Sequence, residues 1–366
     1  MQVRAGGSPL NLPYLEINIR SIYHNTRSLV RLCQAAGVEI FGVTKGVGGL
    51  PAVARAMLAG GVVGIADSRL ANLARLRKSG IGAPLMLLRS PASGEVDQAV
   101  AVADIVLCSA FKTLEALSQG AVKQGREIQV IPMVEMGDRR EGVMPEELGQ
   151  LLMAVDQLSG IRIRGLGTNL ACFAGAIPTA AAISQLEDLA IRHGSNGVFP
   201  LMLSAGNSSA LGLIYDGKWP KLALPTHLRV GESILLGRDV MTKQPLAGTS
   251  QDCFRLFAEV IEVAKKPSLP QGITGCNAFD ERLHLEDRGI HWRAILALGR
   301  QDLGAGRMEP VDVGIEVIGM TSDHTILSVD KAVEAVRVGS RLEFNLDYGG
   351  LLAAMTSPYV GKIIHE

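Results

Sequence analysis

The chain has 366 residues, of which 47% are hydrophobic and 20% are charged, and 42 residues are glycines. This composition is typical of a compact globular protein with many tight turns and excludes a disordered or fibrous chain. The formal net charge is zero, so no excess of charge favours binding to nucleic acid or to an anionic membrane. The length exceeds the size at which one hydrophobic core usually stops growing and therefore predicts two domains.

The cysteines indicate a reducing compartment. They are odd in number, widely spaced and without a Cys-x-x-Cys pair, which argues against a disulfide framework and against a structural metal site. They are Cys33, Cys108, Cys172, Cys253 and Cys276. The N-terminal stretch has no apolar signal core, and the longer apolar stretches are interrupted well short of a membrane span. We expect a soluble, cytoplasmic protein that holds no metal.

From the first strand-like run to about residue 246, apolar runs alternate with amphipathic helical stretches. Eight runs have the character of buried strands: Glu39–Thr44, Val62–Asp67, Pro84–Arg89, Asp104–Ser109, Ile128–Glu135, Arg162–Asn169, Pro200–Ser204 and Leu222–Arg229. The helical stretches between them include Leu50–Ala59, Arg69–Lys78, Phe111–Gly125, Pro145–Leu158 and Thr179–His193. Eight such units predict an α/β fold, a (β/α)8 TIM-type barrel over residues 1–246. The alternative is an open doubly wound sheet, but no Gly-x-Gly-x-x-Gly opens the first unit.

From about Ala247 onward the helical period fades and alternating strand patterns replace it. They cover Cys253–Val263, Trp292–Leu298, Val313–Ile318, Thr325–Val329 and Arg341–Leu346. Glycines and prolines separate them, which predicts a mostly β C-terminal domain over residues 247–366. The first strand of the chain is either part of the barrel or part of this C-terminal domain.

Lys45 closes the first of the eight runs and is followed at once by glycines. In a βα barrel the chemistry belongs at the C-terminal ends of the strands, so a half-buried lysine there can react as an amine with a carbonyl cofactor. Glycine-flanked stretches, Ser204–Ser209 and Arg229–Ser233, follow the last two runs, where barrels commonly bind a phosphate. A lysine early in the barrel and a phosphate site late in it indicate pyridoxal phosphate.

The chain resembles the alanine racemase-like family, fold type III of the pyridoxal phosphate enzymes, and within it the ornithine racemase-like branch. The resemblance runs from end to end of the chain. Its most specific motifs are Val43–Lys45, Gly137–Val143, Gly167–Phe173, Arg229–Gly237 and Gly299–Asp302.

The resemblance implies a pyridoxal 5'-phosphate cofactor, a free amino-acid substrate and roles for three catalytic-site residues. Lys45 matches the lysine that forms the Schiff base with the cofactor. Arg229 matches the arginine that hydrogen-bonds the pyridine nitrogen and keeps it unprotonated, which suits a racemase because it limits side reactions. Arg140 matches the arginine associated with the substrate carboxylate, whose planar guanidinium suits bidentate recognition.

The resemblance also implies the remainder of the cofactor site. Asn207 and Ser208 match the phosphate-binding Asn-Ser pair, and Gly231 and Glu232 match the backbone amides that complete it. Asn169 stands where a histidine is usual under the cofactor ring.

The sequence departs from alanine racemase itself in ways that bear on the substrate. Met133 replaces a lysine that braces the carboxylate-binding arginine in many alanine racemases, and Gly46–Gly49 replaces a motif that ends in tyrosine and histidine. These changes open space and remove fixed charge, which disfavours alanine. A basic amino acid, ornithine or lysine, is the predicted substrate.

Racemisation needs a second acid–base group on the face of the substrate opposite the lysine. In alanine racemase it is a tyrosine from the C-terminal domain of the partner subunit, but the matching stretch here has none. Cys276 and Asp280 are the titratable candidates in that stretch, and a structural role for either one is the competing interpretation. Tyr348 and Tyr359 are further candidates. The resemblance implies a homodimer with shared active sites.

The predicted function is therefore racemisation of a basic amino acid by removal and return of the Cα proton. The alternatives are an alanine or broad-specificity racemase, a D-amino-acid aldolase or lyase, and a noncatalytic pyridoxal phosphate-binding protein. The mostly β C-terminal domain argues against the last, because a pure binder has no evident use for it.

Overall fold

The computed structural model of the chain describes residues 13–194, 202–282 and 284–366. Contacts between residues divide the chain into two compact units. Ile19–Gln251 forms one unit, and Asp252–Glu366 forms the other together with the segment that ends at Asn18. The sequence places the division between residues 246 and 247, and the structure places it between residues 251 and 252.

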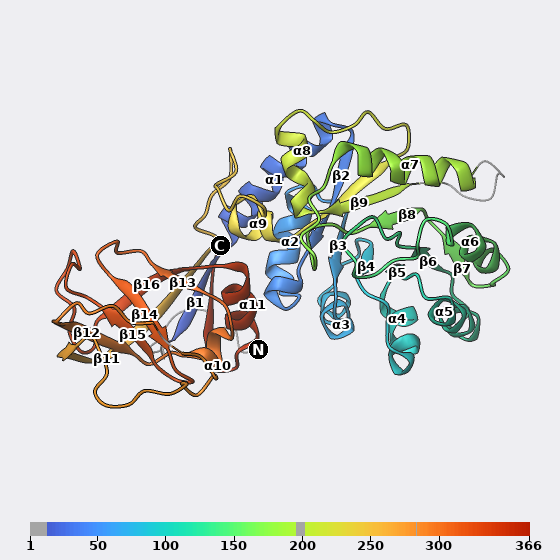
Figure 1. Cartoon of the computed structure of the whole chain (residues 1–366). Helices are drawn as coiled ribbons and strands as arrows, with labels where there is room; N and C mark the ends of the chain where they lie inside the picture. Colours follow the sequence, from blue (N-terminus) through green and yellow to red (C-terminus); the bar gives the residue numbers. More distant parts are fainter. Residues whose placement is uncertain (1–12, 195–201, 283) are drawn as a thin grey trace. The chain divides into compact units, whose positions relative to one another are not determined.

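The unit Ile19–Gln251 is built around a closed parallel β-barrel (Figure 1). Nine strands of the described residues form one sheet in the order β7-β6-β5-β4-β3-β2-β10-β9-β8. They are β2 (Val38–Val43), β3 (Gly64–Asp67), β4 (Leu85–Leu87), β5 (Ile105–Leu107), β6 (Ile128–Ile131), β7 (Ile161–Ile163), β8 (Leu166–Thr168), β9 (Leu203–Asn207) and β10 (Thr226–Val230). β7 and β8 are two pieces of one bent strand, because β7 pairs with β6, while β8 pairs with β9 and its Gly167 bridges to Met133 just beyond β6. The ring is therefore closed, the predicted TIM-type barrel is confirmed, and the open sheet is excluded.

The bend between β7 and β8 depends on a glycine. A Cβ atom at Gly165 would lie 1.9 Å from the carbonyl oxygen of Met202, so a side chain does not fit there. The sequence predicts one continuous strand over residues 162–169, and it is the close approach at Gly165 that splits it into β7 and β8. The strand predicted over residues 200–204 begins outside the described residues, and β9 follows at Leu203.

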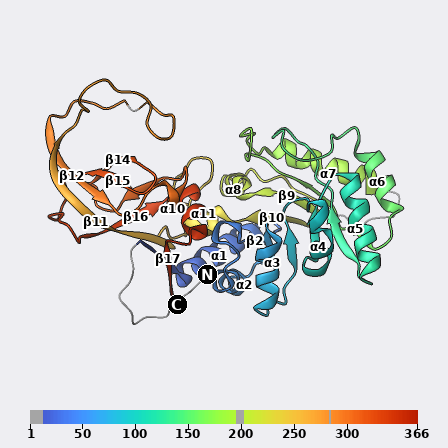
Figure 2. The same ribbon diagram turned by 90° about the horizontal axis from the view of Figure 1, so that it is seen from below.

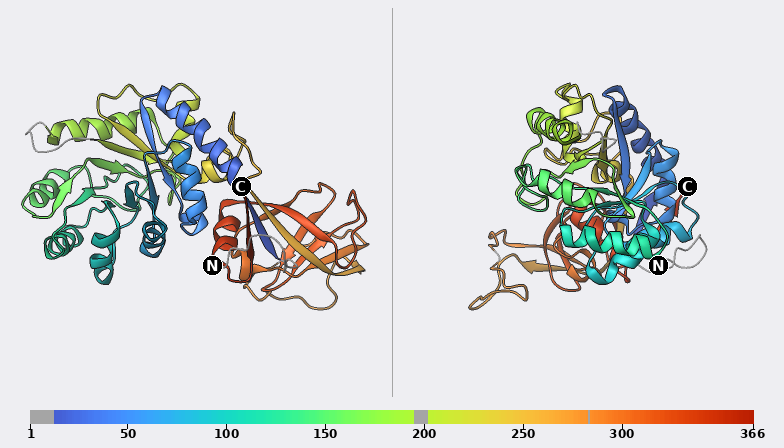
Figure 3. Two further views of the ribbon diagram at one scale, coloured as in Figure 1. Left: turned by 180° about the vertical axis from the view of Figure 1, so that it is seen from behind. Right: turned by 90° about the vertical axis from the view of Figure 1, so that its right-hand side faces the viewer.

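Most residues of the barrel strands are buried, which is why most of these strands appear in the sequence as largely apolar runs. One core cluster draws side chains from β2 to β6: Phe41, Val43, Ala66, Met86, Ile105, Leu107, Ile131 and Met133. Helices lie outside the strands, as Figures 1 and 3 agree: α1 (Ile19–Ala35), α2 (Pro51–Ala59), α3 (Leu70–Lys78), α4 (Val96–Val102), α5 (Phe111–Lys123), α6 (Leu148–Asp156), α7 (Ala180–Gly194), α8 (Leu211–Tyr215) and α9 (Glu232–Leu236). Among the helices of the described residues, none combines the length and the hydropathy that crossing a membrane requires.

The second unit is mostly β, as predicted. Its strands are β1 (Tyr14–Asn18), β11 (Phe254–Pro267), β12 (Ile290–Leu296), β13 (Met308–Pro310), β14 (Glu316–Met320), β15 (Thr325–Ser328), β16 (Arg341–Leu346) and β17 (Gly361–His365), and its helices are α10 (Arg300–Leu303) and α11 (Tyr348–Thr356). The main path of the sheet runs β13-β16-β11-β12-β15-β14, and β1 pairs antiparallel with β11 and parallel with β17. The first strand of the chain therefore pairs within the β unit. A long loop joins β11 to β12 (Figure 2).

Candidate active site

Lys45 follows β2 at the C-terminal end of the barrel, the end at which this architecture places its chemistry. It begins a short 3-10 helix, η1 (Lys45–Val47), and its side chain is half-buried. Gly48 and Gly49, with φ of 59° and 62°, turn the chain back, and the Gly49 amide donates to the Thr44 carbonyl oxygen at 3.2 Å. Lys45 is therefore carried on a tight turn at the strand end.

A buried network holds the base of this turn. The Thr44 hydroxyl donates to Asp67 Oδ2 at 2.8 Å, and Asn72 Nδ2 donates to Asp67 Oδ1 at 3.0 Å. Arg75 Nη1 donates to Asn72 Oδ1 at 3.1 Å and also to the Gly48 carbonyl oxygen. Burial raises the pKa of Asp67, and the hydrogen bonds from Asn72 and Thr44 act in the opposite direction. The Lys45 turn is thus fastened to the end of β3.

Replacing Thr44 with valine is expected to lower the free energy of unfolding by about 1–3 kcal/mol, because the buried Asp67 carboxyl group loses a donor. Urea unfolding followed by circular dichroism measures the effect. Thr356→Val is the matched control, since Thr356 is exposed and its hydroxyl donates within its own helix, and its effect should stay within about 0.5 kcal/mol. Equal losses in the two variants would contradict the role of Thr44.

Arg229 lies on β10, and its buried guanidinium contacts residues of β9 and β8. Nη1 donates to the carbonyl oxygen of Ser204 at 3.0 Å and to the Ser204 hydroxyl, and Nη2 donates to the carbonyl oxygen of Thr168 at 2.8 Å. These partners are neutral oxygens. Burial lowers the pKa of Arg229 to about 10, and the charge of Glu141 acts in the opposite direction. The guanidinium stays protonated at neutral pH and keeps a positive charge at this end of the barrel.

The loops that follow β9 and β10 are joined by a hydrogen bond. η3 (Ser208–Ala210) begins directly after β9, and α9 begins directly after Gly231. The Gly231 amide donates to Ser208 Oγ at 3.1 Å. Asn207 caps the start of η3, because its Oδ1 accepts from the Ser209 amide at 2.8 Å. The beginnings of two short helices therefore meet here, and their backbone N–H groups are suited to a phosphate.

Gly231 also brings the candidate phosphate cradle, defined as Asn207, Ser208, Gly231 and Glu232, close to the Lys45 turn. A Cβ atom at Gly231 would lie 2.9 Å from the Cβ of Val43 and 3.2 Å from its carbonyl oxygen. Val43 ends β2 just before the Lys45 turn. The cradle and Lys45 are thus brought to one end of the barrel.

The side chains beside the cradle are engaged or enclosed by the protein. The Glu232 carboxylate lies 3.3 Å from Lys243 Nζ and 3.8 Å from Arg238 Nη2. The role predicted for Glu232 concerns its backbone N–H and not this carboxylate. The neighbouring Ser233 Oγ is fully buried and has no hydrogen-bond partner among the described residues.

Arg140 and Arg229 both reach Asn169, which follows β8. In one orientation of the Asn169 amide, Oδ1 accepts from Asn207 Nδ2 at 2.9 Å and lies 3.4 Å from Arg229 Nη2. In the opposite orientation the oxygen accepts from Arg140 Nη2 at 2.6 Å and Nε at 3.3 Å. The structure therefore brings Arg140, Asn169, Asn207 and Arg229 together at the end of the barrel that carries Lys45.

The two candidates for the second acid–base group belong to the other unit. Cys276 is exposed, and Asp280 is a non-glycine residue with φ of 59° on the loop between β11 and β12. The Asp280 amide donates to the carbonyl oxygen of Asn277 at 3.1 Å, and the next residue, Glu281, pairs with Arg300. Lys45 belongs to the barrel unit and both candidates belong to the β unit, so the identity of the second group stays a prediction.

Sequence reasoning missed two contributors to the site. Thr44 is an ordinary hydroxyl residue in the sequence, and only its buried hydrogen bond to Asp67 reveals its role. Glu141 lies inside the motif Gly137–Val143, but the motif assigns it no role. The sequence position of Glu141 could have drawn attention to it, because Glu141 directly follows Arg140, the residue predicted to bind the substrate carboxylate.

Comparison with known proteins identifies the relatives of the chain. Residues 17–238 match the family model of the alanine racemase N-terminal domain. The chain is 37% identical to the lysine racemase of Thermotoga maritima, over 96% of this chain and 98% of that protein, and 36% identical to the ornithine racemase of Acetoanaerobium sticklandii, over 96% and 99%. The fold is similar to that of the alanine racemase of Streptomyces lavendulae, with a TM-score of 0.73, 17% identity and 98% of each chain covered.

The family model covers more than half of the chain, and the two racemases align along nearly its whole length. The barrel, the lysine turn and the phosphate cradle lie within the matched residues. The chain therefore belongs to the alanine racemase family.

Proposed function

We propose that the chain is a pyridoxal phosphate-dependent racemase that interconverts the L- and D-enantiomers of a basic amino acid, ornithine or lysine. The observation that carries the proposal is Arg229, buried and positively charged at the end of the barrel that carries Lys45. The names of the relatives that align with almost the whole chain, lysine racemase and ornithine racemase, support the substrate class.

The residues at this end of the barrel fit the cofactor. The backbone N–H groups at the beginnings of η3 and α9 suit its phosphate, and the Arg229 guanidinium suits an unprotonated ring nitrogen. Lys45 would supply the amine that holds its carbonyl carbon. When bound, pyridoxal phosphate withdraws electrons from the substrate Cα and so makes the Cα proton removable.

The protein residues then perform three tasks. Arg140, whose guanidinium reaches Asn169, binds the substrate carboxylate. The Lys45 amine takes or returns the Cα proton on one face, and a group on the opposite face completes the exchange. Arg229 keeps its own proton and therefore does not protonate the ring nitrogen. An unprotonated ring nitrogen favours simple return of the Cα proton over side reactions.

We further propose that two copies of the chain form a dimer with shared active sites, each completed by a residue from the β unit of the other copy. Cys276 and Asp280 are the candidates for that residue, and Tyr348 and Tyr359 are next. This arrangement is the one the family resemblance implies.

A panel assay tests the proposed function. The protein, supplied with pyridoxal phosphate, is incubated with each common L- and D-amino acid, and the enantiomers are separated by chiral chromatography. We expect ornithine or lysine to be racemised fastest. Aldehyde release from a β-hydroxy amino acid would instead indicate an aldolase, and absence of turnover with every amino acid would indicate a binding protein.

A further inference from the structure

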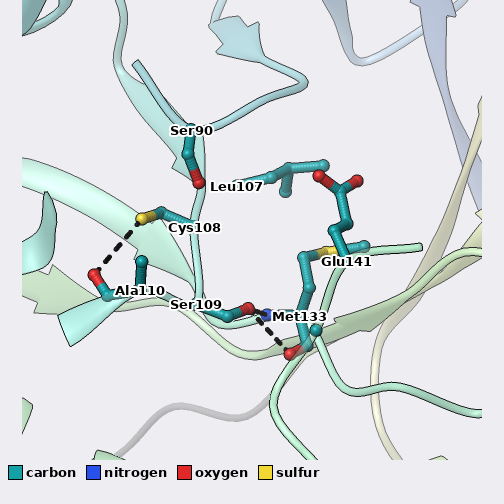
Figure 4. A pocket seen from close by; sticks show the side chains of 8 residues that line it. Ser90, Leu107, Cys108, Ser109, Ala110, Met133 and Glu141 are labelled. Atoms are coloured by element: carbon teal, nitrogen blue, oxygen red, sulfur yellow. Dashed lines mark hydrogen bonds between the residues drawn. The ribbon is translucent and has the colours of Figure 1, made fainter. Parts of the chain in front are cut away.

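A cavity of about 250 Å³ opens at the C-terminal ends of β4, β5 and β6 (Figure 4). The residues that line it come from the end of β5 and from the loops after these three strands: Ser90, Leu107, Cys108, Ser109, Ala110, Met133, Glu141 and Gly142. At roughly 30 Å³ per water molecule the cavity has the volume of about eight waters. It can therefore accept a side chain much larger than a methyl group.

The wall of the cavity combines apolar surface with one acidic group. Leu107 and Met133 are apolar, and the Ser109 hydroxyl is engaged with the backbone of Met133 at 2.7 and 2.8 Å. Among these lining residues Glu141 alone carries a carboxylate. Figure 4 shows Glu141 on one side of the space, with Ser90 and Cys108 on the other. This combination suits an aliphatic chain that ends in a cation.

The negative charge of Glu141 shifts the pKa values of two other groups. The pKa of Cys108 is raised, chiefly by burial and in smaller part by the negative charge of Glu141. The same charge favours the protonated form of Arg229, against the effect of burial. Glu141 therefore acts electrostatically both on the cavity and on the centre proposed to bind the cofactor.

The loop that carries Glu141 is held in place at two points. Asp138 is buried and accepts from the backbone amides of Cys172 and Phe173, at 3.2 and 2.9 Å. The Val143 amide donates to the carbonyl oxygen of Met133 at 2.8 Å. The position of Glu141 relative to the cavity is thus set by the loop after β8 and by the end of β6.

Arg140 links the cavity to the reaction centre. Its guanidinium pairs with Glu141 and also reaches Asn169, which lies beside Arg229. When Arg140 binds a substrate carboxylate, the Glu141 carboxylate becomes available to a second cation. The side-chain ammonium of a basic amino acid supplies that cation. Arg140 then pairs with the substrate carboxylate and Glu141 with the substrate ammonium, so no charge is left unpaired.

Met133 is consistent with this arrangement. The lysine that the family resemblance implies at this position in many alanine racemases is carbamylated, and a carbamate carries a negative charge. The uncharged thioether of Met133 leaves Glu141 as the acidic group among the lining residues.

Resting on the proposed function, we propose that Glu141 is a specificity-determining residue that binds the side-chain ammonium of ornithine or lysine in this cavity. The cavity is then the subsite for the substrate side chain. Arg140 binds the substrate carboxylate at one end of the aliphatic chain, and Glu141 binds the ammonium at the other end.

The test compares kcat/KM for ornithine with that for norvaline, which has the same carbon chain without the terminal amine. Glu141→Gln should lower kcat/KM for ornithine by about 10- to 100-fold more than it lowers kcat/KM for norvaline, as expected for the loss of a charged hydrogen bond to the side-chain ammonium. Glu141→Asp keeps the charge on a shorter arm and should shift the preference from ornithine towards the longer lysine. Glu146→Gln, an exposed residue of the same loop, is the matched control and should behave as wild type.

Each other outcome overturns the inference. Equal losses on ornithine and norvaline would assign Glu141 to the positioning of Arg140 alone, and unchanged kinetics on both would remove it from the site. A wild-type protein that racemises only neutral amino acids would sink the inference while the racemase function stands.

A binding measurement separates this inference from the proposed function. If the wild-type protein racemises no amino acid, the proposed function fails, and calorimetric titration of ornithine and norvaline into the Lys45→Ala protein decides the inference. Tighter binding of ornithine that disappears in the Lys45→Ala, Glu141→Gln double variant supports the ammonium site. Equal binding of the two ligands overturns it.

Discussion

Replacing Lys45 with alanine is expected to lower the rate of racemisation by about 10³-fold or more, because the same amine holds the cofactor carbonyl and moves a proton at the substrate Cα. Chiral chromatography measures the loss. Lys112→Ala, an exposed lysine of α5, is the matched control and should leave the rate unchanged. Methylamine added to the Lys45→Ala protein should restore part of the activity.

Chemical labelling provides an independent measure of the same role. Borohydride reduction of the wild-type protein with pyridoxal phosphate should attach the cofactor to the peptide that contains Lys45, as mass spectrometry can establish. An adduct on another lysine, or full activity in Lys45→Ala, would refute the assignment.

The shared-site dimer makes the Lys45 variant useful in a mixing experiment. Lys45→Ala mixed with Asp280→Asn or Cys276→Ser should regain activity, up to one working site in each heterodimer, if the second group comes from the partner subunit. Homodimers of Asp280→Asn and Cys276→Ser that are both fully active would rule out both candidates and direct the search to Tyr359. An active monomer would rule out the shared site itself.

Replacing Arg229 with glutamate is expected to change which reaction the protein performs. A carboxylate at this position would hold a proton on the ring nitrogen, so racemisation should fall by at least about tenfold while the keto acid formed by transamination rises. Enantiomer ratios and keto-acid release are measured on the same samples. Arg55→Glu, the same exchange at an exposed position of α2, should leave both unchanged.

A second variant separates chemistry from folding at this position. Arg229→Lys keeps the positive charge but replaces the planar guanidinium that bonds Ser204 and Thr168, so the rate should fall without a rise in keto acid. A product ratio that is the same in Arg229→Glu and Arg229→Lys would show that charge at this position does not govern the reaction.

The barrel could be predicted because most residues of its strands are buried, so that most of the strands are largely apolar runs bounded by turn residues. The bend at Gly165 could not, because it depends on the approach of a carbonyl oxygen from Met202, a contact that no local pattern records. The same limit applies to strand ends, which depend on which neighbour supplies the next hydrogen bond.

The candidate site divides in a similar way. Lys45, Asn207 and Arg229 could be found because the ends of parallel strands gather at one edge, whatever the loops between them do. The contact between Arg140 and Asn169 depends instead on two loops that fold towards each other after β6 and β8, and the sequence contains no sign of it. The residue opposite Lys45 stays a prediction.

The pairing of β1 has a consequence for biosynthesis. Tyr14 lies opposite Phe257 on one side and Gly361 on the other, although α1, the very next element, belongs to the barrel. At ordinary rates of translation β1 therefore waits on the order of tens of seconds for its last neighbour, β17. During that interval the edge of β1 that pairs with β17 is open to other chains. A nascent chain of this protein is thus exposed to mispairing at β1, and a truncation that removes β17 would leave that edge open permanently.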